Sequence, residues 1–91
     1  MVYITAIRLS AGGSRHEHIT DVQWENPATG KTGASTREQM VDFIINKNGD
    51  ARVRDAEGND VEVAVASAEP PYIRTWADDV WTDNLLALPT F

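Results

Sequence analysis

The sequence contains no cysteine among its 91 residues. It therefore has no disulfide framework, no thiolate metal site and no thiol nucleophile. No apolar run approaches the roughly 20 residues that span a bilayer. Residues 1–8 also lack the basic region, long apolar run and small-residue cleavage site of a signal peptide. We therefore expect a cytoplasmic protein with no membrane partner.

Positive charge is scarce: 8 Lys and Arg residues face 14 Asp and Glu residues, for a net charge of −6. Such a surface repels phosphate backbones and anionic lipids, so no nucleic-acid partner is expected. The hydrophobic fraction of 42% is enough for one core, and we expect a single domain over residues 1–91. No strained nucleophile motif surrounds Ser14 and no pair of acids stands out. We therefore lean against an enzyme and expect no cofactor.

Alternating and β-branched segments predict five strands. The Gly12-Gly13 loop would join the first two strands as an antiparallel hairpin, and Gly58 suits a short turn between the third and fourth. Residues 26–33 are expected to form a loop. The predicted strands are Val2–Leu9, His18–Trp24, Ala51–Asp55, Asp60–Ser67 and Tyr72–Trp76.

One helix is predicted to begin with a capping box, either Ser35 with Glu38 or Thr36 with Gln39. A broad apolar face would pack it flat across the sheet, and Asn48-Gly49 would end it. The apolar residues of this face are Met40, Val41, Phe43, Ile44 and Ile45. The expected fold is α+β: a mainly antiparallel sheet of four to five strands carrying one long helix. Its order would be β-β-α-β-β-β, followed by a short helical turn over Asp83–Leu88.

Residues 70–89 are unusually apolar for a C-terminal stretch, with two of the three tryptophans, a tyrosine and three leucines. An exposed tail is normally polar and low in aromatics, so we expect this one to complete the core. Trp24, Trp76 and Trp81 could instead line a ligand groove. We favour a core position for Trp24.

The chain contains five sequence blocks in this order: Ile4–Arg8, His16–Ile19, Ser35–Val41, Tyr72–Thr75 and Asp83–Pro89. Similar blocks occur in the same order in a family of small bacterial proteins, the domain of unknown function numbered thirty-eight ninety-two. The chain resembles this family over nearly its whole length, which implies a single domain and little about activity. Members commonly have a glycine after the aspartate of the last loop. Asp79 follows Asp78 here, so the resemblance does not predict a tight turn.

Arg74 lies between Ile73 and Thr75 in the aromatic C-terminal stretch. A shielded guanidinium needs a carboxylate, because an unpaired buried charge costs several kcal/mol. A structural ion pair is one interpretation, and an anion-recognising fork is the other. The acids that could pair with it are Asp78, Asp79 and Asp83.

We predict a small binding or interaction module with a polar site between the Gly12-Gly13 loop and the C-terminal loop. Its partner would be a small anionic ligand or a protein. For Asn84, the alternative is that Asp83-Asn84 caps the last turn. The candidate ligand-binding residues are His16, His18, Arg74 and Asn84.

The His16-Glu17-His18 segment supports an alternative function as a metal-dependent enzyme. At the start of a strand, alternate residues point the same way, so both imidazoles could bind one metal. Asp78, Asp79 or Asp83 would supply oxygen ligands. The other interpretation is that one imidazole bonds to the loop and the other is exposed.

Overall fold

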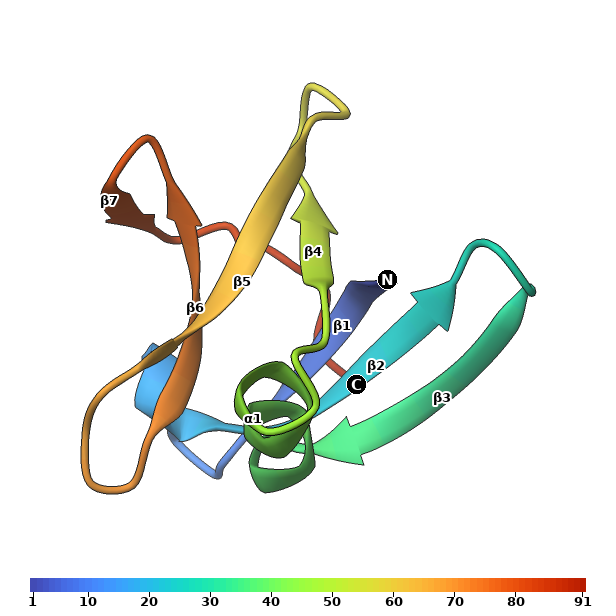
Figure 1. Cartoon of the computed structure of the whole chain (residues 1–91). Coiled ribbons are helices and arrows are strands. Elements are labelled where there is room, and N and C mark those ends of the chain that lie inside the picture. Colours follow the sequence, from blue (N-terminus) through green and yellow to red (C-terminus); the bar gives the residue numbers. More distant parts are fainter.

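The computed structural model describes residues 1–91 as a seven-stranded sheet with one α-helix (Figure 1). The strands follow the order β3-β2-β1-β4-β5-β6-β7, and every neighbouring pair is antiparallel except β1 with β4. No helix has the length and apolar character needed to cross a membrane. The elements are β1 Val2–Leu9, a 3₁₀ turn η1 His16–His18, β2 Ile19–Asn26, β3 Lys31–Thr36, α1 Arg37–Ile45, β4 Ala51–Arg54, β5 Asp60–Ala66, β6 Tyr72–Ala77 and β7 Val80–Thr82.

The predicted fold class is wrong, because the sheet is larger and mixed and the helix has only nine residues. Residues 31–36, expected to be loop and helix start, form the edge strand β3. Their polar, small side chains show no apolar alternation. They pair because the turn ending at Gly30 (φ +74°) folds Lys31 back against Asn26. Hydrogen bonding to β2 therefore makes a strand of residues 31–36, although their own strand propensity is weak.

The helix α1 begins with one of the two predicted capping boxes. Thr36 Oγ1 accepts from the Gln39 backbone N–H at 3.1 Å, and the Thr36 N–H donates to Gln39 Oε1 at 2.9 Å. The apolar face is narrower than predicted: Met40 is buried, whereas Ile45 is 58% exposed. Asn48 (φ +52°) takes the left-handed conformation that ends the helical segment.

The β6–β7 hairpin has a two-residue turn that the sequence did not predict. Ala77 pairs with Val80, and both residues between them are left-handed, Asp78 at φ +51° and Asp79 at φ +63°. Positive φ at both central positions suits the twist of a hairpin and usually recruits Asn-Gly or Asp-Gly. The chain makes this turn without the glycine, at a conformational cost.

We expect Asp79→Gly to be more stable than Asp79→Ala by about 1 kcal/mol, because only glycine takes positive φ freely. Both variants lose the same carboxylate, so their difference isolates the backbone term. Urea unfolding followed by circular dichroism measures it. Equal stability of the two variants would contradict the left-handed assignment at this position.

The C-terminal segment after β7 completes the core, as predicted. It runs from β7 across the molecule to β1 (Figure 1). Leu85 is completely buried within the main hydrophobic cluster. The Ile7 N–H donates to the Pro89 carbonyl and the Phe91 N–H donates to the Ile7 carbonyl, each at 3.0 Å. Asp83–Leu88, expected as a helical turn, instead forms successive turns with bonds three residues apart.

The strand β1 pairs with β2 along one edge, and along the other edge it divides its pairing between β4 and the C-terminal segment in a curled sheet (Figure 1). Val2 and Tyr3 pair with β4, whereas Ile7 bridges to Thr90 of the C-terminal segment. As a result, η1 lies against β6, although β2 and β6 are four strands apart in the sheet (Figure 1). This curl brings His16 beside Arg74.

Candidate functional site

His16 is a buried histidine at the start of η1. It is 6% exposed, and its Nε2 is the one buried side-chain nitrogen or oxygen without a hydrogen-bond partner. Buried polar atoms nearly always have a partner, so an orphaned one indicates strain or a role in binding or catalysis. His16 Nε2 therefore marks the centre of the candidate site.

Arg74 extends from β6 toward the same place and forms the predicted ion pair. Its Nη2 lies 2.8 Å from Asp83 Oδ1, and its Nε donates to the Thr82 carbonyl at 3.2 Å. Of the three acids proposed as partners, the structure selects Asp83. The carboxylate is 73% exposed, whereas the Arg74 side chain is 29% exposed. The guanidinium is thus held by the Thr82 backbone carbonyl through Nε and by the exposed Asp83 carboxylate through Nη2.

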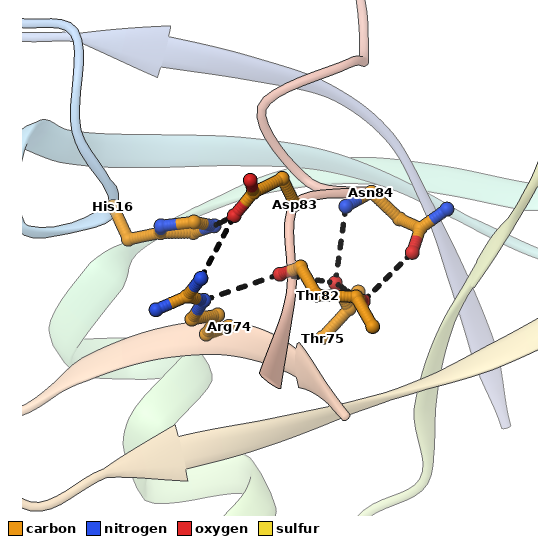
Figure 2. Close-up of polar contacts among 6 residues, drawn as sticks. All are labelled: His16, Arg74, Thr75, Thr82, Asp83 and Asn84. Carbon is orange, nitrogen blue, oxygen red and sulfur yellow. Dashed lines mark hydrogen bonds and ion pairs between the residues drawn. The ribbon is translucent and has the colours of Figure 1, made fainter. Parts of the chain in front are cut away.

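The same Asp83 oxygen also faces His16 (Figure 2). Its distance to His16 Nε2 is 3.9 Å, too long for a hydrogen bond. Burial lowers the pKa of His16, and the positive charge of Arg74 lowers it further, whereas Asp83 and Glu17 partly oppose this. The site therefore presents a neutral imidazole and a permanent cation to one exposed carboxylate.

A network of hydroxyl groups positions the backbone around Asp83. Thr75 Oγ1 donates to the Thr82 carbonyl at 3.0 Å and accepts from the Asn84 N–H at 3.2 Å. The Thr82 hydroxyl lies 2.6 Å from Thr75 Oγ1 and 2.7 Å from Asn84 Oδ1. The side chain of Asn84 points away from His16 and Arg74 (Figure 2). Asn84 therefore supports the site and does not line it.

Sequence reasoning missed Thr75 and Thr82. They are directly opposite each other on β6 and β7. Facing threonines often bond across a strand pair, but that signal needs the unpredicted strand β7. The hydroxyl network could not be anticipated without it.

His18 does not join His16. Because residues 16–18 form a 3₁₀ turn, the strand alternation that would align both imidazoles is absent. His18 Nδ1 accepts from the backbone N–H groups of Ser14 at 3.0 Å and Arg15 at 3.1 Å, which orders the loop. No group of three or more His, Cys, Asp and Glu residues is arranged to hold a metal ion. The geometry thus gives no support to a shared metal between the two histidines.

The tryptophans do not line a common groove. Trp24 packs against the core from β2. Trp76 and Trp81 form an edge-to-face pair across β6 and β7, with ring centroids 4.7 Å apart and Trp81 39% exposed. Such a pair stabilises a hairpin.

The fold and this cluster define a small mixed-sheet domain with a His–Asp–Arg site. Residues 3–89 match the family described as "Protein of unknown function (DUF3892)". The chain belongs to this family, and the match includes every residue of the site. Comparison with curated proteins and with solved structures found no match.

Proposed function

We propose that this domain is a small binding module that recognises the carboxylate or phosphate group of a small anionic ligand with Arg74 and His16. One observation carries the proposal: the unpartnered Nε2 of buried His16 faces the same anionic oxygen that Arg74 holds. Asp83 occupies the anion position when no ligand is bound. The cytoplasmic location expected from the sequence stays a prediction.

The Asp83 carboxylate is suited to being displaced. It is mostly exposed and makes one close contact, to Arg74, so an exposed ion pair of this kind contributes little stability. A ligand with two or three oxygens can accept a hydrogen bond from Arg74 and also reach His16 Nε2. Asp83 lies too far from Nε2 for a hydrogen bond. Arg74 stays oriented meanwhile, because its Nε is bonded to the Thr82 carbonyl.

The test is a titration with inorganic phosphate and with acetate, followed by the NMR resonances of the His16 ring. Arg74→Lys is expected to weaken binding about tenfold or more, since lysine cannot form a two-pronged contact. Asp83→Asn is expected to strengthen binding about threefold to tenfold, because an internal competitor reduces the fraction of binding-competent protein. Arg52→Lys, which alters a cation paired with Asp50 and Asp60 elsewhere, should leave binding unchanged.

The pH profile gives a second readout of the same site. A protonated imidazole favours an anion, and the pKa of His16 is lowered in the free protein. Binding should therefore strengthen as the pH falls through the His16 pKa of the complex, and level off below that of the free protein. His16→Gln should remove this dependence. Unchanged affinity in both Arg74→Lys and Asp83→Asn would show instead that the ion pair only fastens the C-terminal segment to β6.

A further inference from the structure

A second concave site lies between α1 and the β2–β3 pair and shares no residue with the His16 site. The cleft has a volume of about 520 Å³. Clefts of roughly 300–1,000 Å³ accommodate small organic ligands. Its lining draws on three strands, the helix and Lys47, so it belongs to the folded sheet and not to one loop.

The indole of Trp24 supplies an aromatic surface in this cleft. One side of the ring packs on the backbone of Gly33, where a side chain would place its Cβ 2.5 Å from Trp24 Cζ2. Trp24 Nε1 donates to Ser35 Oγ at 3.0 Å, which fixes the ring orientation. Phe43 and Met40 of α1 add apolar lining. The cleft therefore holds a rigid aromatic platform that is partly exposed.

The charges around this platform are opposite to those of the protein as a whole. The chain carries a net charge of −6 and has two lysines, Lys31 and Lys47. Both line the cleft. Lys31 forms no ion pair, and Lys47 Nζ lies 3.8 Å from Asp42, whose other carboxylate oxygen accepts from Asn46. Asp42 is the one acid in the lining, so two flexible ammonium groups face a single carboxylate.

We propose that this cleft binds a planar aromatic molecule that carries a phosphate or carboxylate group. The ring stacks on Trp24, and Lys31 and Lys47 contact the anionic group. Stacking on Trp24 and contacts from a lysine ammonium group both accept many different rings and anions. The ligand class is therefore defined by a flat aromatic ring with an attached anionic group. This binding is independent of the Arg74 site.

The experiment follows the Trp24 Nε1–H signal by two-dimensional NMR, with Trp76→Phe and Trp81→Phe identifying the other two indole signals. Adenosine monophosphate and 2-naphthoate are the two aromatic anions. Adenosine and inorganic phosphate separate the contributions of ring and charge. We expect saturable shifts from at least one aromatic anion, adenosine binding about fivefold or more weakly, and no shift of Trp24 from phosphate. Comparing 2-naphthyl phosphate with 2-naphthoate, which carry the same ring, distinguishes phosphate from carboxylate ligands.

Variants of the exposed lysines test the charge contacts without disturbing the core. Lys31→Gln and Lys47→Gln are each expected to weaken binding about threefold to tenfold. Arg15→Gln, which removes an exposed cation elsewhere, and Arg74→Lys should have no effect. The proposal is overturned if neither aromatic anion saturates the shift by about 10 mM, if phosphate alone reproduces it, or if the double lysine variant binds as well as the native protein.

Discussion

Replacing Leu85 by alanine is expected to lower the free energy of unfolding by about 3 kcal/mol. Leu85 is completely buried and belongs to the main hydrophobic cluster, although it lies in the irregular segment after β7. Deleting its branched end removes apolar contacts and leaves a cavity between the C-terminal segment and the sheet. Urea unfolding monitored by circular dichroism measures the change.

The neighbouring Leu86 provides a matched control. It packs against the cluster but is only partly buried, so Leu86→Ala should cost about 1 kcal/mol. Small domains are stable by roughly 5–15 kcal/mol, and the Leu85 variant should still unfold cooperatively. If both leucine variants lose the same small amount, the C-terminal segment is not part of the core.

Replacing Thr75 by valine is expected to lower the free energy of unfolding by about 2 kcal/mol, although the volume hardly changes. Thr75 is completely buried. Its hydroxyl donates to the Thr82 carbonyl and accepts from the Asn84 N–H. Valine leaves the Asn84 N–H without a partner, whereas the Thr82 carbonyl keeps its bond from Arg74 Nε. An unsatisfied buried group is costly. Thermal and urea unfolding measure the effect.

Thr75→Ser separates hydrogen bonding from packing. Serine keeps the hydroxyl and loses one methyl group, at a cost of about 1 kcal/mol. The valine variant should therefore be the less stable of the two. A valine variant as stable as the native protein, beside a weakened serine variant, would show that packing alone explains the burial of Thr75.

These two positions explain how the His16 site is assembled. Leu85 fixes the C-terminal segment in the core, and Thr75 fixes the backbone of residues 82–84 against β6. Asp83 belongs to this backbone and directs its side chain toward Arg74 and His16 (Figure 2). The site is thus held by buried groups, while its carboxylate is 73% exposed to solvent.

The sequence predicted two of the residues that meet in the candidate site, Arg74 and His16. An arginine in an aromatic stretch required an acid, and His16 was singled out by its place after the glycine loop. His18 and Asn84 were assigned to the ligand site by proximity in sequence, whereas the structure turns them to the loop backbone and to Thr82. Side-chain direction depends on local backbone geometry, and η1 is not the strand that the prediction assumed.

Local chemistry in the sequence determined the elements that carry their own signal. Alternation of apolar and polar residues defines β5, and Gly58 at φ +83° lies in the turn between β4 and β5. The capping box of Thr36 with Gln39 starts α1. Each of these depends on residues a few positions apart, so short-range sterics and hydrogen bonding suffice.

Only the tertiary structure decided the number of strands, the parallel β1–β4 pair and the meeting of His16 with Arg74. The edge strand β3 and the short β7 have weak local preference and exist because a neighbouring strand offers them hydrogen bonds. The curl that joins η1 to β6 follows from β1 sharing its edge with β4 and the C-terminal segment. Backbone groups must find partners wherever the folded chain places them, and no short window of sequence contains that information.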